Sequence, residues 1–279
     1  MQEGRSTPMR SRRPIRREGR AVPRRFHCLS VPYDSVSRSF EELARADTSL
    51  GEIVLRRRIE PVSQNDIVEV ILAGDGLMSS LFTHGEEQTA QLGLAAIANT
   101  SAGGIDVLVG GLGLGYTARS VLDDARVRTL HVIDALDVVI DWHQRHLVPL
   151  GAGLTADPRC TLVHGDFFAL AASPPPLISG NAPSQFDAIF VDIDHSPRHH
   201  LSPSHASFYT PNGLRTFVKL LQPSGVFSLW SNDSADPEFI ATLHTAFESA
   251  EAHDISFWNF LIDDHTHSTI YVATNPLHH

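Results

Sequence analysis

The sequence contains very little cysteine. Cys28 and Cys160 are the only two among 279 residues, and no CxxC pair occurs. Two thiols cannot build a disulfide framework, and the usual cysteine pattern of a zinc site is missing as well. We therefore expect a chain that folds without cross-links in a reducing, cytoplasmic compartment.

Long apolar runs and internal repeats are also absent. No stretch approaches the roughly 20 apolar residues that a membrane-spanning helix needs. The N-terminus lacks the apolar core of a secretory signal. Hydrophobic residues make up 42% of the chain and charged residues 19%, which are the proportions of an ordinary globular protein. These absences predict a globular protein without a membrane partner.

Charge is divided unevenly along the chain. The net charge is −10, yet residues 1–25 hold nine Arg and only two acidic residues. The remainder therefore carries a net charge of −17, which favours a cationic substrate over nucleic acid, although acidity also serves solubility. The Arg-rich tail could bind nucleic acid or a membrane, but it has no aromatic residues and almost nothing to bury. We expect residues 1–25 to be disordered, or to precede the true start of the protein.

A small β region is expected between this tail and the rest of the chain. Two β-rich runs and a shorter third run suggest its strands: Gly51–Ile59, Asp66–Leu72 and Leu77–Phe82. We assign residues 26–84 to this N-terminal β region. Helical spacing of apolar residues then begins at Gly85 and continues to Asn99.

Short apolar strands alternate with helices from Ile105 onward. The expected strands are Asp106–Val109, Thr129–Ile133, Cys160–Val163, Phe186–Val191 and Gly225–Trp230. The expected helices are Tyr116–Asp123, Asp137–His146, Phe167–Ala172, Pro211–Leu221 and Pro237–Ala250. Two further strands, Phe257–Leu261 and Thr269–Ala273, would form a terminal antiparallel hairpin around the polar turn 263–268. This alternation predicts a doubly wound α/β fold over residues 85–279, with a mainly parallel seven-stranded sheet covered on both faces.

A glycine-rich turn joins the first of these strands to its helix. The segment reads VLVGGLGLG from residue 107 to residue 115. Gly111, Gly113 and Gly115 let the backbone pass close to a ligand, and the helix that follows offers free N–H groups. By itself the turn is also compatible with a tight connection that binds nothing.

Acidic residues end the next two expected strands. Asp134 lies 23 residues after Gly111, where a carboxylate can accept hydrogen bonds from a ribose diol. Gly165 and Asp166 follow the next strand, where an acid can reach an adenine amino group, although a helix cap is an alternative role. Ligands in such sheets bind at the carboxyl ends of the strands. Together these residues predict a site for the nucleoside part of an S-adenosylmethionine-type cofactor.

The fourth motif, FVDIDHSP, begins at residue 190. Asp192 and Asp194 are two positions apart, so both carboxylates would face one spot in an extended chain. They could hold a cationic amine there and take a proton from it, because an amine must be neutral to attack a sulfonium carbon. A capped loop and a metal site are alternatives, the latter because His195 and His199 have HxxxH spacing. That spacing joins two His only in a helix, which Pro197 opposes, so we expect no metal.

In this order the four motifs resemble those of the spermidine synthase (polyamine aminopropyltransferase) family, specifically its divergent spermidine-synthase-like bacterial branch. The resemblance covers about residues 50–275. It implies a Rossmann-like methyltransferase fold, with S-adenosylmethionine or its decarboxylated form as co-substrate. It also implies aminopropyl transfer to an amine or polyamine, and a homodimer. By resemblance Asp134 holds the ribose, Asp166 holds the adenine end, and Asp192 activates the amine, whereas Asp194 is shifted by one position.

The N-terminal substrate motif departs from the family pattern. The family has D-G-x-x-Q, but here Asp75-Gly76 leads to Ser79, and no Tyr-His pair follows. We take Ser79, Glu86 and His195 as the candidates for binding the small-molecule acceptor. A methyltransferase acting on a small molecule uses the same sheet and glycine turn, and so would a nucleoside-binding homologue without activity. Both remain alternative functions.

Overall fold

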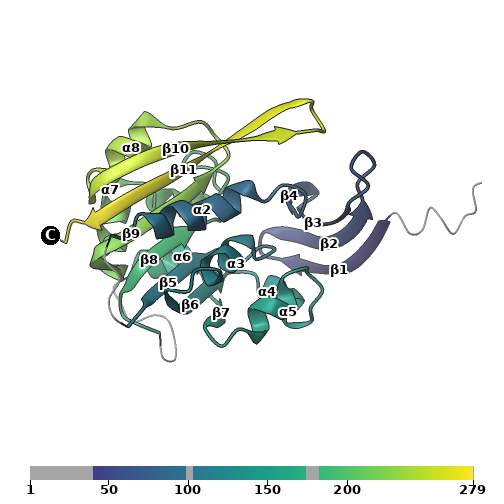
Figure 1. The fold of residues 1–279 in the computed structure, drawn as a ribbon, viewed down its shortest axis with the longest axis horizontal. Helices are drawn as coiled ribbons and strands as arrows, with labels where there is room; N and C mark the ends of the chain where they lie inside the picture. Colours follow the sequence, from purple (N-terminus) through teal and green to yellow (C-terminus); the bar gives the residue numbers. More distant parts are fainter. Residues whose placement is uncertain (1–39, 99–102, 174–181, 279) are drawn as a thin grey trace, which may run out of the picture.

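The computed structural model describes residues 40–98, 103–173 and 182–278, which form two β-sheets and the helices around them (Figure 1). The smaller sheet has the order β1-β2-β3-β4, and the larger one has the order β10-β11-β9-β8-β5-β6-β7. The Arg-rich tail expected at residues 1–25 lies outside the described residues. No helix in the described ranges is both long and apolar enough to cross a bilayer.

The smaller sheet is antiparallel throughout. Its strands are β1 (Phe40–Thr48), β2 (Gly51–Ile59), β3 (Asp66–Leu72) and β4 (Asp75–Ser79). The sequence did not predict β1, because charged residues interrupt its apolar pattern and most of its positions are exposed. This strand pairs with β2 in an antiparallel register that places Glu41 opposite Arg57 and Glu42 opposite Arg56. An ion pair between Arg45 of β1 and Glu52 of β2, at 2.6 Å, joins the two strands.

The larger sheet contains seven strands, of which five are parallel. These five are β5 (Ile105–Gly110), β6 (Val127–Asp134), β7 (Cys160–His164), β8 (Phe186–Val191) and β9 (Leu221–Ser231). The antiparallel pair β10 (Phe247–Asn259) and β11 (Asp264–Pro276) completes the sheet beside β9. The predicted mainly parallel seven-stranded sheet with a terminal hairpin is therefore confirmed.

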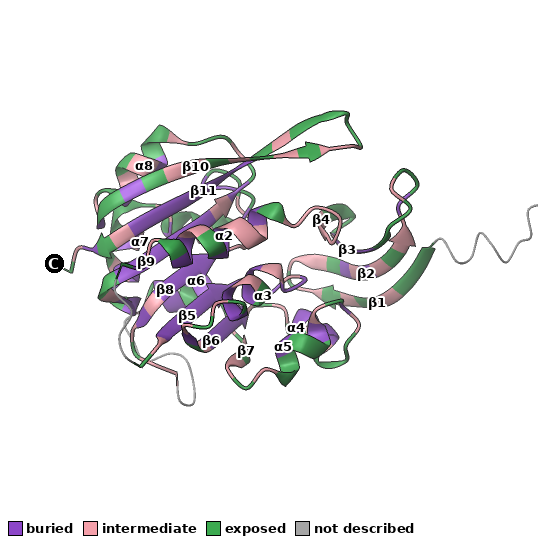
Figure 2. Cartoon of the chain, in the orientation of Figure 1, coloured by how far each residue is buried: buried purple, intermediate pink, exposed green. Residues whose placement is uncertain are grey.

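Helices cover both faces of the larger sheet. They are α2 (His84–Ala95), α3 (Tyr116–Leu122), α4 (Asp137–Gln144), α5 (Gly151–Ala156), α6 (Phe167–Ala171), α7 (Pro211–Phe217) and α8 (Pro237–Leu243). Two short 3₁₀ helices, Pro203–Ser207 and Val218–Leu220, complete the described elements. Every residue of β5 is buried, and Figure 2 shows the buried central strands enclosed by more exposed helices. This burial explains why the parallel strands are continuous apolar runs in the sequence.

The last part of the chain differs from the prediction. The expected helix Pro237–Ala250 ends at Leu243, and Phe247 already begins β10. Apolar residues at Phe247 and Ala250 are buried against the sheet, and a short apolar run does not distinguish a helix from a strand. The hairpin turn also lies earlier than expected, because Asn259 pairs directly with Asp264. The pairing of β11 with β9 covers only residues 269–274, so the distal part of the hairpin projects from the sheet (Figure 1).

Candidate functional site

A cavity lies where the carboxyl ends of β5, β6 and β8 meet the smaller sheet. We call it the larger cavity; its volume is about 270 Å³. Its wall from the larger sheet and the following loops includes Gly111, Gly113, Asp134, Asp166 and Asp192. Its wall from the smaller sheet consists of Ser49, Leu50, Val70, Leu72, Leu77 and Met78. The two sheets therefore enclose one cavity at the edge that the sequence indicated.

The glycine turn forms the floor of this cavity. Gly111 has a φ of 97°, and a Cβ atom at this residue would lie 2.1 Å from the carbonyl oxygen of Asp192. Gly113 has a φ of 48°, and its Cβ would lie 2.5 Å from the Met78 side chain. Gly111 needs glycine, because its backbone is left-handed and the Asp192 backbone comes very close, whereas the atoms near Gly113 belong to the flexible end of the Met78 side chain.

Asp134 stands at the end of β6 beside this turn. One of its carboxylate oxygens accepts a hydrogen bond from the Leu112 N–H at 2.9 Å, and the other accepts from the Leu136 N–H at 2.8 Å. Burial raises the pKa of Asp134, while these backbone donors oppose the shift. A carboxylate has four acceptor lone pairs, so these backbone donors leave acceptor capacity that a ligand hydroxyl could use.

Asp166 caps helix α6 and also lines the larger cavity. Its Oδ1 accepts from the N–H groups of Phe168 and Ala169, at 2.8 Å and 3.1 Å. The cap therefore occupies one oxygen and leaves Oδ2 for a ligand. The helix-cap role and the ligand role, which were alternatives in the sequence, are compatible in the structure.

A second, smaller pocket adjoins the larger cavity; we call it the smaller pocket. Five residues line both spaces: Leu77, Met78, Gly113, Asp192 and Ile193. The residues that line only the smaller pocket are Glu86, Leu112, Leu114, Gly115, Tyr116, His195 and Trp230. Two carboxylates and two aromatic rings thus surround a small volume next to the glycine turn. Asp192 stands at the border between the two spaces.

Asp192 and Glu86 influence each other electrostatically. The Thr117 hydroxyl donates a hydrogen bond to Asp192 Oδ2 at 2.8 Å. Burial raises the pKa of Asp192 despite this donor. Burial and the charge on Asp192 together raise the pKa of Glu86 to about 8. These shifts favour one shared proton on the pair near neutral pH, and a cation in the smaller pocket would favour its release.

Asp194 has a different environment from Asp192. Its buried carboxylate accepts hydrogen bonds from Leu201 N–H at 2.7 Å, from His205 Nδ1 at 2.8 Å and from the Tyr209 hydroxyl at 2.9 Å. Burial and the adjacent carboxylate raise the pKa of Tyr209 well above its ordinary value. The strand ends at Val191, so the extended geometry that would turn both carboxylates to one spot does not continue. Asp194 organises the following loop instead of lining either space.

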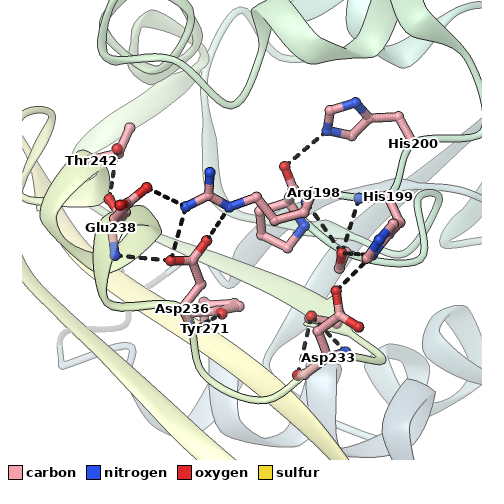
Figure 3. Close-up of polar contacts among 11 residues, drawn as sticks. Arg198, His199, His200, Asp233, Asp236, Glu238, Thr242 and Tyr271 are labelled. Carbon is pink, nitrogen blue, oxygen red and sulfur yellow. Dashed lines mark hydrogen bonds and ion pairs between the residues drawn. The ribbon is translucent and has the colours of Figure 1, made fainter.

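Ion pairs attach this loop to the start of α8 (Figure 3). Arg198 contacts Asp236 at 2.6 Å and Glu238 at 2.5 Å, and His199 contacts Asp233 at 2.8 Å. Of the two HxxxH histidines, His199 therefore makes a surface contact, whereas His195 lines the smaller pocket. No group of three or more His, Cys, Asp or Glu side chains in the described ranges is arranged to hold a metal ion.

The structure gathers most of the predicted site residues, but not all of them. The predicted residues that line the larger cavity are Gly111, Gly113, Asp134, Asp166 and Asp192. Those that line the smaller pocket are Gly115, Glu86, His195 and again Asp192. Ser79, Gly165 and Asp194 line neither space. The Ser79 hydroxyl instead accepts a hydrogen bond from Leu81 N–H at 3.2 Å.

Sequence reasoning missed Thr117, Met78 and His205. Thr117 contacts Asp192, whereas Met78 and His205 line the larger cavity. No sequence signal identifies them, because each reaches the site from an element whose position depends on the tertiary fold.

Comparison with known proteins gives a partial sequence match. No family model matches the chain. A curated relative, polyamine aminopropyltransferase 2 of Pseudomonas aeruginosa, is 27% identical over 173 residues, which is 56% of this chain and 45% of the relative. The match therefore spans less than half the length of that relative.

Solved structures provide a match over more of the chain. The spermidine synthase of Thermotoga maritima has a TM-score of 0.61 at 16% identity, covering 84% of this chain and 72% of that one. A spermidine synthase in complex with the transition-state analogue AdoDATO has a TM-score of 0.62 at 16% identity, covering 84% and 73%. A probable spermidine synthase from Corynebacterium glutamicum gives 0.56 at 14% identity, covering 83% and 79%. The fold is that of the spermidine synthases, and the resemblance indicated by the motifs is confirmed.

Proposed function

We propose that this protein is a spermidine-synthase-like transferase, which moves the aminopropyl group of decarboxylated S-adenosylmethionine to an amine. One observation carries the proposal: Asp192 lies between a cavity lined by the glycine turn and a small pocket lined by a second carboxylate, Glu86. A donor nucleoside and an acceptor amine would meet at this acid. The partial sequence match to a polyamine aminopropyltransferase supports the same reaction.

The larger cavity would hold the donor. Asp134 would accept hydrogen bonds from the ribose hydroxyls, and Asp166 Oδ2 would accept one from the adenine amino group. Gly111 and Gly113 would allow the backbone to approach the sulfonium end. These roles follow from the positions of the residues at the carboxyl ends of β5, β6 and β7.

The smaller pocket would hold the acceptor. A neutral amine nitrogen attacks the carbon beside the sulfonium, the C–S bond breaks, and 5′-methylthioadenosine leaves. Asp192 accepts the proton that the amine nitrogen loses. Glu86, Tyr116, His195 and Trp230 would surround the amine and keep its nitrogen in line with the C–S bond. Positioning and proton transfer would supply most of the catalysis.

The charge of the site favours a decarboxylated donor. Among the described residues that line the two spaces there is no Lys or Arg, whereas Glu86 and Asp192 both lie where the donor's side chain would end. A carboxylate on the donor would be repelled there. An aminopropyl group carries an ammonium instead, which these acids would attract.

Mass spectrometry of the products tests the proposed reaction. The protein is incubated with decarboxylated or intact S-adenosylmethionine and a panel of amines. We expect 5′-methylthioadenosine from the decarboxylated donor. S-adenosylhomocysteine would instead identify a methyltransferase, and no product from either donor would indicate a nucleoside-binding homologue.

An Asp192→Asn variant tests the role of the acid. The loss of a general base should reduce the transfer rate by about 10²-fold or more. Calorimetric binding of 5′-methylthioadenosine should stay close to that of the unsubstituted protein, because Asp134 and Asp166 remain. Asp263→Asn, in the exposed hairpin turn, is the matched control. Full activity of Asp192→Asn would contradict the proposed mechanism.

A further inference from the structure

Thr117 occupies a central position that the proposed reaction does not yet use. It is the second residue of α3 and is only 3% exposed. Its hydroxyl lies 2.8 Å from Asp192 Oδ2 and 3.3 Å from the backbone carbonyl of Glu86. One hydroxyl therefore touches the segments that carry both acids of the smaller pocket. The hydroxyl has a single proton to donate. The Asp192 carboxylate is the closer and the stronger acceptor, so it receives this hydrogen bond.

The other groups that face the acid pair do not replace this hydrogen bond. Glu87 of α2 is acidic and accepts a hydrogen bond from Thr83 at 2.7 Å. The Tyr116 hydroxyl of α3 is bonded to Ser80, and His195 is exposed. Met78 of β4 and Trp230 of β9 are uncharged. Among the described side chains, Thr117 is the one that donates to Asp192.

The two carboxyl groups differ in what stabilises their ionised forms. Asp192 accepts from a fixed, buried side chain, whereas Glu86 accepts only from its own backbone N–H and also faces the charge of its partner. A hydrogen bond to the charged form favours ionisation, and a nearby like charge opposes it. The shared proton therefore belongs on Glu86.

Resting on the proposed function, we propose that Thr117 is a positioning residue that keeps Asp192 the ionised member of the Glu86–Asp192 pair. Its hydroxyl occupies Oδ2 and leaves Oδ1 to accept the proton of the attacking amine. Glu86 holds the proton of the pair until a cation enters the smaller pocket, which would favour its release.

Three variants separate this role from a structural one. Thr117→Val removes the hydroxyl with little change of volume, and Thr117→Ser restores it. Ser120→Ala is the matched control, because the Ser120 hydroxyl makes the analogous contact to the Glu87 carbonyl at 3.2 Å without reaching Asp192. Carbon-13 NMR follows the ionisation of both carboxyl groups in the ligand-free chain, with signals assigned through Asp192→Asn and Glu86→Gln.

We expect Thr117→Val to raise the midpoint of Asp192 ionisation by about one pH unit, as befits the loss of a charge-assisted hydrogen bond. The acidic limb of the pH profile of kcat/KM should move upward by the same amount. Thr117→Ser and Ser120→Ala should both retain the original midpoint.

An unchanged Asp192 midpoint in Thr117→Val would overturn the proposal, and so would equal shifts in the valine and serine variants. The NMR titration needs no turnover. If no amine yields 5′-methylthioadenosine while the midpoint still shifts, the transferase proposal fails and the role of Thr117 in ordering the pair stands.

Discussion

At the scale of single residues, Asp192 and Asp194 show how burial and partners separate two similar side chains. Asp192 has one side-chain donor and lines both spaces, so its other oxygen is available to a ligand. Asp194 accepts three hydrogen bonds from the protein. A buried carboxylate that accepts three hydrogen bonds from the protein has a structural role. The DID pattern does not distinguish the two carboxylates, but their contacts leave only Asp192 with an oxygen that faces the two spaces.

Gly111 provides a prediction at this scale. Gly111→Ala adds a Cβ atom 2.1 Å from the Asp192 carbonyl oxygen at a φ of 97°. We expect a loss of unfolding free energy of roughly 2–4 kcal/mol, from the left-handed backbone and the overlap combined. Binding of 5′-methylthioadenosine should weaken as well, because the floor of the larger cavity moves.

Urea denaturation and calorimetry measure the two effects of Gly111→Ala. Gly153→Ala is the control, since a Cβ in that helix would meet no atom within 4 Å. The control should be neutral or slightly stabilising. Equal stability of the two variants would show that the glycine turn is not constrained as described.

At the scale of elements, the loop after β8 depends on Asp194. Its carboxylate joins Leu201, His205 and Tyr209, and the first two of these residues line the larger cavity. Arg198 fixes the outer side of the same loop to α8 (Figure 3). Asp194 thus holds the loop together internally, Arg198 attaches it to the start of α8, and Leu201 and His205 form part of the wall of the larger cavity.

Asp194→Asn should loosen this loop. The amide keeps one acceptor oxygen and leaves buried donors unpaired, so we expect a loss of about 2–4 kcal/mol in unfolding free energy. Nucleoside affinity should fall by about tenfold, which corresponds to roughly 1.4 kcal/mol. Tyr209→Phe removes one of the three donors and should cost about 1 kcal/mol. Thermal unfolding and calorimetry measure these effects; an Asp194→Asn variant as stable as the unsubstituted chain would contradict them.

At the scale of the whole molecule, the acid pair makes stability depend on pH. The pKa of Glu86 is raised to about 8 in the folded chain, so the folded state holds a proton that the unfolded state releases at lower pH. Stability from this group is complete at acidic pH and is lost as the pH rises towards that value. This direction is opposite to that of most paired carboxylates.

Glu86→Gln should therefore stabilise the ligand-free chain at alkaline pH. We expect a gain on the order of 1–2 kcal/mol near pH 8.5, reduced by the partial solvent access of the pocket, and almost none near pH 5. Denaturation at a series of pH values measures the difference. Glu248→Gln, an exposed residue of β10, should show no such trend. A Glu86→Gln gain that is independent of pH would contradict the prediction.

Several expectations about the whole molecule stay predictions. The division into residues 26–84 and 85–279, the homodimer, the cytoplasmic location and the lack of nucleic-acid and membrane partners belong to this group. Light scattering of the purified protein would establish the number of subunits.

The sequence by itself determined the strand–helix alternation and the acids at the strand ends. Buried parallel strands must be apolar, and a glycine turn or a terminal acid is a local feature that residue order reveals. It could not predict β1 or place β10 correctly, because strand pairing with β2 and with β11 overrides weak local signals. Only the tertiary structure decided which polar groups meet. The Thr117 hydroxyl contacts Asp192, which lies 75 residues later in the sequence. No pattern of neighbouring residues predicts a contact over that separation.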